Sequence, residues 1–393
     1  MATSIASSPS VLSTAKSSTR LAAIDALRGF VMALMLVDHM RETIYLHAQV
    51  SDPVDASTVE PALFFTRLTA TLCAPVFIAL TGLSAWLYGQ NKSKADVAAF
   101  LLKRGLFLIV LELTVINFAW TGQLPPEKVY LQVIWCIGLC MTALAGLIYL
   151  PRWAQMGVAV SLIAGHHLLG PIAFAPGDSL YIPWAILHDR SWIALADTMQ
   201  ARTSYPILPW IGIIVLGYLC GPLFKKDATP SEQSARLISA GIGLIAAFLA
   251  LRWVNVYGDF PWEVQDTSVR SVIAFLSLTK YPPSLLFSLS TLGVGALLLA
   301  WLIRNPDHPI ERFFAPFGAA PLFFYILHLY VLKLCYLALV ALFGTNKGAY
   351  FGVDDVWMIW AASALSLAVL YPPTIWFARL KQRRRDLPFL RYL

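Results

Sequence analysis

An acid–imidazole pair, Asp38–His39, follows directly after the apolar run Gly29–Val37. A carboxylate next to an imidazole raises the basicity of the ring and helps to orient it. Such a histidine can act as a general base, or it can carry an acyl group for a short time. On a helix, Asp38 can pair with Arg41 three residues on, and His39 can pair with Glu42 in the same way. We therefore take Asp38, His39 and Glu42 as candidate catalytic residues; the alternative is a charge cluster that anchors a helix end at an interface.

A cation, Arg28, lies at the opposite end of the same apolar run. At the helical rise, the interval from Arg28 to His39 spans roughly 16 Å and returns both side chains to nearly the same face. Ionisable groups on membrane helices usually face protein or a water-filled cavity. A transmembrane helix with a cation near one end and an acid–imidazole pair near the other can take part in a reaction whose substrates come from both sides of a bilayer.

Two further ionisable residues lie inside apolar segments: His328 in PLFFYILHLYVLK and Glu112 in LIVLELTVINF. Such groups need a polar partner in hydrocarbon, and they often mark a functional site. His328 is a candidate catalytic residue that stabilises an oxyanion; alternatively, it donates to a carbonyl group of a neighbouring helix. For Glu112 we expect a structural ion pair with a residue on another helix.

The composition indicates an integral membrane protein. The chain is 58% hydrophobic and 13% charged, whereas soluble domains average about 25% charged residues. With about 20 apolar residues needed per span, we predict an all-α fold: a polytopic membrane helical bundle of about ten transmembrane helices. The expected spans are 24–45, 62–88, 100–120, 130–150, 153–169, 205–224, 235–256, 284–303, 313–343 and 356–377.

The distribution of basic residues predicts the orientation. With ten crossings and a cytoplasmic N-terminus, most Lys and Arg residues fall on the cytoplasmic side, in agreement with the positive-inside rule. Both termini are then cytoplasmic. We expect a disordered tail over 1–19, a transmembrane domain over 20–380 and a basic tail over 381–393. The net charge of +7 therefore reflects basic loops, and we expect no nucleic-acid partner.

Two polar stretches are expected on the outer side. The segment 170–204 is too polar to cross a membrane. We predict that it forms a loop or an interfacial helix that covers one end of the bundle. The stretch TKYPPS, at 279–284, breaks an apolar run, and irregular backbone at that depth has to be buried in protein or line a cavity. It predicts the wall of an acceptor pocket, although an interfacial aromatic belt explains the aromatic residues equally well. The candidate acceptor-binding residues are Asn255, Tyr257, Asp259, Lys280 and Tyr281.

We expect no metal site. His166 and His167 are adjacent, so on a helix they point about 100° apart and cannot chelate one ion together. No HExxH or HxxxH spacing is present, and no GxSxG or phosphate-loop motif occurs in a usable context.

Several stretches, taken together, resemble a known family, the bacterial members of the heparan-α-glucosaminide N-acetyltransferase catalytic-domain family. This family is part of a broader group of transmembrane acyltransferases that includes the acyltransferase-3 proteins. The resemblance covers nearly the whole chain from Arg20. It is carried by AAIDALRGFVMALMLVDHMRE, PALFFTRLTATLCAPVFIALTGLSAW, FLLKRGLFLIVLEL, QVIWCIGL, YPILPWIGIIVLGY, RWVNVYGD, TKYPPSLLFSLSTLG and PLFFYILHLY.

The resemblance implies a transmembrane O- or N-acetyltransferase. Acetyl-CoA is the expected co-substrate on the cytoplasmic side, and a sugar or glycan is the expected acceptor on the other side. The Arg28-to-His39 interval is similar to that of the arginine and essential histidine in acyltransferase-3 proteins. Arg28, Lys103 and Arg104 are the expected contacts of the donor, with His328 helping to hold its thioester.

The resemblance also leaves a second histidine open. In the lysosomal enzyme of the family, the functional histidine follows an Asn-containing helix end, and Asp38 stands where that Asn would be. His47 is the closer positional match, with a two-residue gap. We prefer His39 because Asp38 and Glu42 are placed to tune it, and we keep His47 as the alternative catalytic residue.

Other functions remain open at this point. One is a transporter or flippase for a polar solute that uses Glu112 and His328 as intramembrane ion sites. Another is a non-catalytic membrane scaffold. The expected location is a bacterial inner membrane. A homo-oligomer is compatible with the apolar surfaces of the spans, and the acceptor is not identified.

Overall fold

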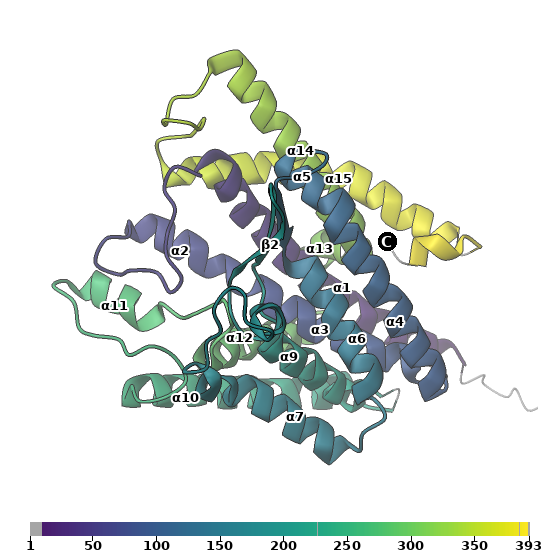
Figure 1. The fold of residues 1–393 in the computed structure, drawn as a ribbon. Helices are drawn as coiled ribbons and strands as arrows, with labels where there is room; N and C mark the ends of the chain where they lie inside the picture. Colours follow the sequence, from purple (N-terminus) through teal and green to yellow (C-terminus); the bar gives the residue numbers. More distant parts are fainter. Residues whose placement is uncertain (1–9, 226, 385, 392–393) are drawn as a thin grey trace, which may run out of the picture.

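The chain forms a bundle of helices with one small sheet, as Figure 1 shows for the computed structural model. The structure describes residues 10–225, 227–384 and 386–391. The helices are α1 (Ser10–Ile44), α2 (Pro61–Ala70), α3 (Cys73–Gly89), α4 (Lys94–Leu111), α5 (Asn117–Thr121), α6 (Val133–Leu147), α7 (Arg152–Ala164), α8 (Tyr181–Leu187), α9 (Leu208–Leu219), α10 (Pro230–Val254), α11 (Ser268–Leu276), α12 (Leu285–Arg304), α13 (Pro309–Ala319), α14 (Pro321–Phe343) and α15 (Val356–Arg383). A π-helical turn, Glu112–Ile116, joins α4 to α5.

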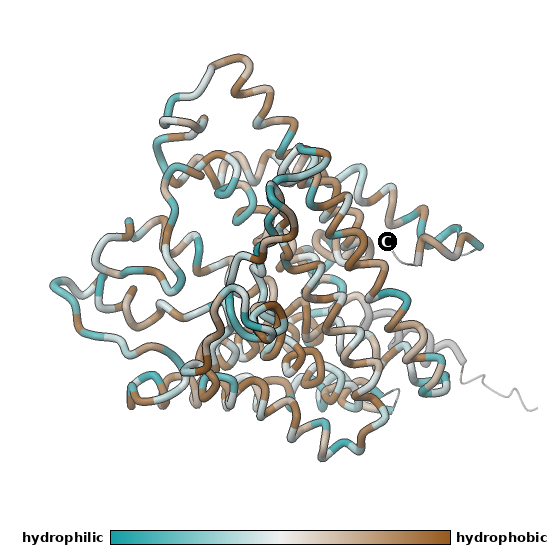
Figure 2. The backbone as a smooth tube through the Cα atoms, in the orientation of Figure 1, coloured by the Kyte–Doolittle hydropathy of each residue, from teal (hydrophilic) through white to brown (hydrophobic). Residues whose placement is uncertain are grey.

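Within the part of the chain that the structure describes, five helical segments are long and apolar enough to cross a membrane: Pro61–Gly89, which joins α2 to α3, and α10, α12, α14 and α15. Hydrophobic residues follow most of the helices, and hydrophilic residues concentrate in the connecting loops (Figure 2). The chain therefore has the helical character of an integral membrane protein. The other expected spans correspond to helices that carry more charge, such as α1 and α4, or that fall short of about 20 residues, such as α6 and α7.

The expectation of an all-α fold needs one correction. The strands β1 (Lys128–Leu131), β2 (Trp192–Ala196) and β3 (Met199–Thr203) form a sheet in the order β1-β3-β2. β1 is parallel to β3, and β2 is antiparallel to it. The segment 170–204, expected to be a loop or an interfacial helix, thus contains the short helix α8 and the β2–β3 hairpin. Strands of four or five residues inside a polar, aromatic segment leave too short a pattern to be recognised from the sequence.

Two expected boundaries also change. The span expected over 313–343 is divided, because α13 ends at Ala319 and Pro321 opens α14. Proline lacks an amide proton and fits the first turn of a helix, so it starts a new helix here. α1 begins at Ser10, inside the tail expected to be disordered, and residues 1–9 of that tail lie outside the described part of the chain.

α1 lies at the centre of the arrangement and contacts α3, α12, α13, α14 and α15. Its closest neighbour is α13. A side chain at Gly29 would clash with the carbonyl group of Phe314, and one at Gly318 would clash with that of Asp25. Small residues let two helix backbones approach closely. This approach sets the position of α1, and with it the position of the polar residues at its end.

We expect Gly29→Ala to destabilise the protein by about 1–3 kcal/mol, because the added methyl group must separate α1 from α13. The measurement is the thermal unfolding midpoint of the detergent-purified variant. Gly146→Ala is the matched control, because nothing lies within 4 Å of a side chain added there. The control should be neutral or stabilising. Equal midpoints for the two variants would contradict the backbone contact.

Candidate active site

A cavity of about 710 Å³ lies inside the bundle. Arg104 on α4, His39 on α1 and Tyr350, in the segment before α15, all line it. Arg104 and Trp120, which also lines the cavity, lie on one continuous helical segment and are separated by roughly 24 Å at the helical rise. The cavity can therefore hold a long, thin ligand that approaches His39 from the Arg104 end.

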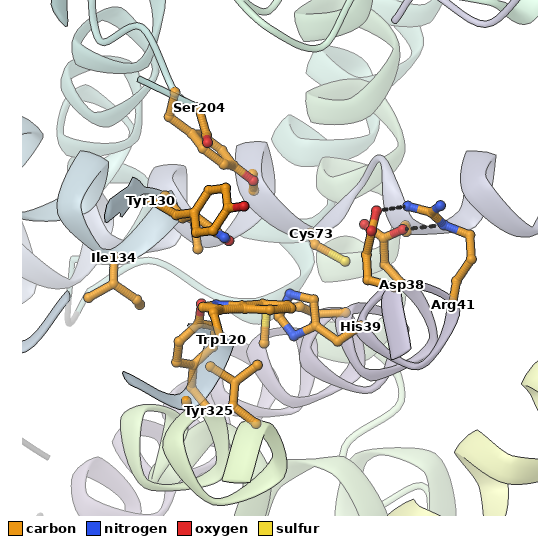
Figure 3. A pocket seen from close by; sticks show the side chains of 18 of the residues that line it. Asp38, His39, Arg41, Cys73, Trp120, Tyr130, Ile134, Ser204 and Tyr325 are labelled. Atoms are coloured by element: carbon orange, nitrogen blue, oxygen red, sulfur yellow. Dashed lines mark hydrogen bonds and ion pairs between the residues drawn. The ribbon is translucent and has the colours of Figure 1, made fainter. Parts of the chain in front are cut away.

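His39 projects into the cavity from the end of α1 (Figure 3). Its Nδ1 atom lies 2.7 Å from Nε2 of His328 on α14, and the two rings are stacked with their centroids 5.0 Å apart. Nδ1 of His328 lies 2.9 Å from the carbonyl oxygen of Phe324. The two histidines that the sequence analysis singled out, from opposite ends of the chain, thus meet directly.

These contacts fix the tautomers of both rings. A carbonyl oxygen only accepts, so Nδ1 of His328 donates to Phe324. In a neutral ring the Nε2 atom of His328 is then the acceptor, and Nδ1 of His39 donates to it. The Nε2 atom of His39 is left with its lone pair. No described residue forms a hydrogen bond with this atom, and the side chain lines the cavity.

Two aromatic rings hold the imidazole of His39 from the sides. Trp120 and Tyr325 each pack edge-on against it, with centroids 5.1 Å and 5.9 Å away. Neither residue was expected from the sequence, because α5 and α14 meet α1 only in the folded chain. The ring of His39 is therefore fixed in both tautomer and orientation.

Asp38 is engaged by two cations rather than by His39. Arg41 donates to Asp38 through Nε at 3.2 Å, as the i, i+3 spacing predicts, and it also pairs with Glu42. Lys280 lies 3.8 Å from the other oxygen of Asp38. The expected pairing of Glu42 with His39 is therefore wrong, because the buried Arg41 takes both carboxylates. Figure 3 shows its contact with Asp38.

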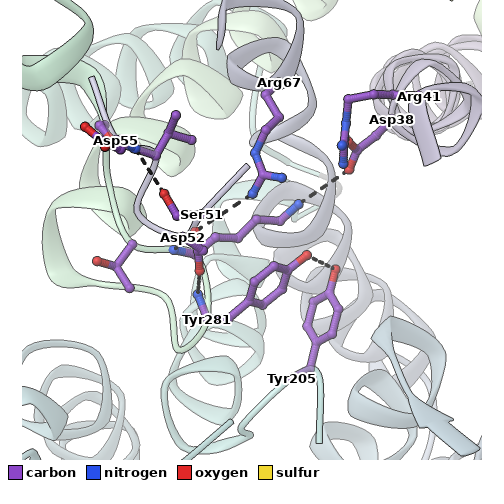
Figure 4. A network of polar contacts seen from close by, with 12 residues as sticks. Asp38, Arg41, Ser51, Asp52, Asp55, Arg67, Tyr205 and Tyr281 are labelled. Carbon is purple, nitrogen blue, oxygen red and sulfur yellow. Dashed lines mark hydrogen bonds and ion pairs between the residues drawn. The ribbon is translucent and has the colours of Figure 1, made fainter. Parts of the chain in front are cut away.

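Lys280 and Tyr281 reach the cavity through a polar network, shown in Figure 4. Asp52 accepts hydrogen bonds from the backbone amides of Lys280 and Tyr281, at 3.2 and 2.9 Å, and Arg67 lies 4.0 Å from it. The hydroxyl of Tyr281 donates to that of Tyr205 at 3.2 Å. The break at 279–284 thus lines the cavity wall.

The other three candidate acceptor residues do not line this cavity. Asn255 caps α10 and bonds the backbone of Trp262, and Tyr257 donates to the carbonyl of Ala164. Asp259 accepts from the amide and hydroxyl of Thr279 and the hydroxyl of Ser284. Of the three, Asp259 holds the 279–284 segment in place and so supports the cavity wall from behind.

The three residues expected to contact the acetyl donor also lie in different surroundings. Arg104 lines the cavity, whereas Lys103 is exposed and does not. Arg28 binds Asp25 at 2.6 Å, Ser84 at 2.9 Å and the carbonyl of Gly318 at 3.0 Å. Lys381, which the sequence analysis missed, lies within electrostatic range of Arg28 and Arg104. The Arg104 end of the cavity is thus surrounded by cations.

His47 lies apart from the cavity lining and packs against Tyr45, with ring centroids 4.7 Å apart. Glu112 is buried, and one of its oxygens accepts from the amide of Trp135 at 3.0 Å. The expected ion pair of Glu112 is wrong for the described residues, because its partner is the first turn of α6. The other oxygen of Glu112, Oε1, has no hydrogen-bond partner among the described residues, and the transporter alternative stays a prediction.

The rings of His166 and His167 lie 4.2 Å apart. Within 10–225, 227–384 and 386–391, no three His, Cys, Asp or Glu residues are grouped so that they could hold a metal ion. The expectation of a metal-free reaction stays a prediction.

The cavity also contains basic residues that the sequence analysis did not single out: Arg67, Arg190, Arg202 and Lys333. The distribution of charge in the sequence could have identified two of these residues. Arg190 and Arg202 lie in a segment expected on the outer side, where the positive-inside rule predicts few cations.

A histidine lone pair that faces a cavity inside a helical membrane bundle suits an enzyme that moves a proton or an acyl group. Residues 20–251 match the family model described as heparan-alpha-glucosaminide N-acetyltransferase, catalytic, and the chain belongs to this family. Family identity implies an acetyl donor, acetyl-CoA, and transferase chemistry. His328 and Lys280 lie beyond the matched range. None of the curated proteins compared with the chain matches it.

We expect His328→Leu to lower kcat for acetyl transfer by about 10²-fold or more while changing the KM for acetyl-CoA little, because the tautomer of His39 is no longer fixed. Steady-state kinetics of the purified variant measure both values. His328→Gln is the conservative control, since its side-chain oxygen can still accept from Nδ1 of His39. Equal losses in both variants would contradict the tautomer role.

Proposed function

We propose that this protein transfers an acetyl group from cytoplasmic acetyl-CoA to a sugar or glycan on the opposite side of the membrane. The observation that carries the proposal is the free Nε2 lone pair of His39, which faces a cavity inside the bundle. Family membership supports the donor and the transferase chemistry. The acceptor and the two-sided arrangement are part of the proposal.

The donor enters from the Arg104 end. Its phosphates are held by the cations near that mouth, Arg104 and Lys381, and its pantetheine arm extends along the cavity. The roughly 24 Å between the levels of Arg104 and Trp120 suits a long, thin arm. This brings the thioester carbon to His39.

The chemistry at His39 is a proton transfer coupled to acyl transfer. Nε2 of His39 takes the proton of the acceptor amine or hydroxyl as its nitrogen or oxygen attacks the thioester carbonyl. The carbon–sulfur bond then breaks, and the thiolate leaves with the proton that His39 returns. In a second route, Nε2 first attacks the thioester carbonyl and the thiolate leaves. The acceptor then attacks the acetyl group, its proton passes to the thiolate, and Nε2 is released with its lone pair. Both routes need the same lone pair.

We also propose ten crossings with both termini in the cytoplasm of a bacterial inner membrane. The predominance of Lys and Arg in the loops on one side supports this orientation. It puts the Arg104 end of the cavity toward the cytoplasm, and it puts the β2–β3 hairpin and the 279–284 segment on the outer side.

We expect His39→Ala to reduce acetyl transfer by at least ~10²-fold, because the variant loses the Nε2 lone pair that faces the cavity. The assay follows labelled acetyl-CoA and amino-sugar acceptors with detergent-purified protein. His47→Ala is the matched control and should retain activity, since His47 does not line the cavity. A fully active His39→Ala protein would refute the proposed function. The reverse pattern would assign the reaction to His47.

We expect Arg104→Gln to raise the KM for acetyl-CoA about tenfold, because the donor loses a charged hydrogen bond at the mouth of the cavity. Lys103→Gln, one residue away and exposed, should leave this KM unchanged. Initial rates over a range of acetyl-CoA concentrations give both values. The donor path would be wrong if only the Lys103 variant weakened donor binding.

A further inference from the structure

The acyl transfer proposed for this cavity passes through an oxyanion that needs hydrogen-bond donors. When the acceptor attacks the thioester carbon, the π pair of the carbonyl group moves onto its oxygen, which becomes negatively charged. When the carbon–sulfur bond breaks, that pair returns to form the carbonyl group again, and the thiolate leaves. Each donor that is fixed beside this oxygen is worth roughly 10²–10³-fold in rate.

His328, which the sequence suggested for this task, has no donor left for an oxyanion. In the neutral ring its only proton is donated from Nδ1 to the carbonyl oxygen of Phe324, and its Nε2 atom accepts from His39. The cations Arg41 and Lys280 also line the cavity, but both are held at Asp38. The aromatic residues that pack against the ring of His39 are the next candidates.

Trp120 and Tyr325, which pack edge-on against His39, each carry one hydrogen-bond donor that is not used. Nε1 of Trp120 and the hydroxyl oxygen of Tyr325 are buried and have no hydrogen-bond partner among the described residues. Most buried polar side-chain atoms in proteins have a partner, so each exception calls for an explanation. Both side chains line the cavity and lie beside His39 (Figure 3). Two unused donors therefore lie next to the candidate catalytic histidine.

The two donors also lie close to each other. The indole N–H of Trp120 is within interaction range of the hydroxyl of Tyr325, although the two form no hydrogen bond. The carboxyl group of Glu112 is within range of the same hydroxyl and forms no hydrogen bond with it either. A single oxygen atom placed between the two donors can therefore accept from both, which is the arrangement of an oxyanion hole.

The backbone explains how the two donors reach one place. On α14, Tyr325 lies three residues before His328, so one face of the helix presents both the hydroxyl and the second imidazole. Trp120 lies sixteen residues after Arg104, and an unbroken α-helix would place these two residues about 160° apart around its axis. The π-helical turn Glu112–Ile116 inserts one residue, which reduces this angle to about 60°. Arg104 and Trp120 can then line the same cavity.

We propose that the indole N–H of Trp120 and the hydroxyl of Tyr325 form the oxyanion hole of this transferase, which makes both of them catalytic residues. This inference rests on the proposed function and deepens it. The two donated protons stay on Trp120 and Tyr325, while on the direct route the proton of the acceptor passes to Nε2 of His39 and then to the thiolate. On the acyl-histidine route the same donors stabilise both tetrahedral intermediates, because each develops its charge on the same carbonyl oxygen.

The test uses Tyr325→Phe, which removes the hydroxyl and keeps the ring against His39. We expect kcat for acetyl transfer to fall by about 10²-fold or more, with the KM for acetyl-CoA changed by less than about twofold. Tyr330→Phe is the matched control and should keep kcat, because the Tyr330 hydroxyl donates to the carbonyl of Val115 and does not line the cavity. Trp120→Phe is the second variant, and it should lower kcat by at least about tenfold.

A second acyl donor separates an oxyanion hole from simple packing of the His39 ring. In dithioacetyl-CoA, sulfur replaces the carbonyl oxygen, and sulfur is a weak hydrogen-bond acceptor. Tyr325→Phe should therefore lower kcat for acetyl-CoA at least about tenfold more than it lowers kcat for dithioacetyl-CoA. A packing role would lower kcat for both donors by the same factor, and that result would overturn the oxyanion hole.

The failures of the two proposals are distinguishable. Full activity of Tyr325→Phe in an enzyme that depends on His39 overturns the oxyanion hole alone. An equal loss in Tyr330→Phe, or a raised KM for acetyl-CoA with kcat unchanged in Tyr325→Phe, also overturns it. Transfer that persists unchanged in His39→Ala, or no transfer by the wild-type protein, overturns the proposed function and this inference with it.

Discussion

The polar end of α1 is buried inside an apolar bundle, and this constraint determines much of what surrounds it. A buried charge or imidazole is costly unless other protein groups satisfy it. Arg41 is almost fully buried, and its Nε and Nη2 atoms donate to Asp38 and Glu42, whereas its Nη1 atom has no hydrogen-bond partner among the described residues. Asp38 needs a further cation and receives Lys280, while His39 receives His328. Each partner comes from a different element, so satisfying one turn of α1 requires α14 and the 279–284 segment to meet there.

The same constraint links the two halves of the chain. The first half supplies Asp38 and His39, and the second half supplies Lys280 and His328, which lie outside the range matched to the family. The backbone contact of α1 with α13 through Gly29 and Gly318 brings these halves together. Because α14 follows α13 after a single residue, the position of α13 also limits where His328 can lie. Packing at one end of α1 therefore supports the chemistry at the other.

Local spacing in the sequence was enough to predict some of this. Most of the helices, the Asp38–Arg41 pair and the role of 279–284 in lining a cavity follow from patterns within a few residues. The partners of His39 and Glu112 were missed because they are tertiary contacts: a histidine far along the chain and the amide of Trp135. For the same reason, Asn255, Tyr257 and Asp259 were taken as binding residues. Polar residues that hold a loop and those that face a ligand look alike in a sequence.

The choice of His328 rather than a carboxylate as the partner of His39 has a chemical consequence. A carboxylate would bring a second negative charge next to Asp38 in a buried region, and that charge would need its own cation. A neutral imidazole accepts the Nδ1 proton of His39 without adding charge, and its own donor is satisfied by Phe324. Asp38 is left to hold Arg41 and Lys280. The bundle thus separates two tasks: the carboxylate organises the cations, and the second histidine directs the lone pair of the first into the cavity.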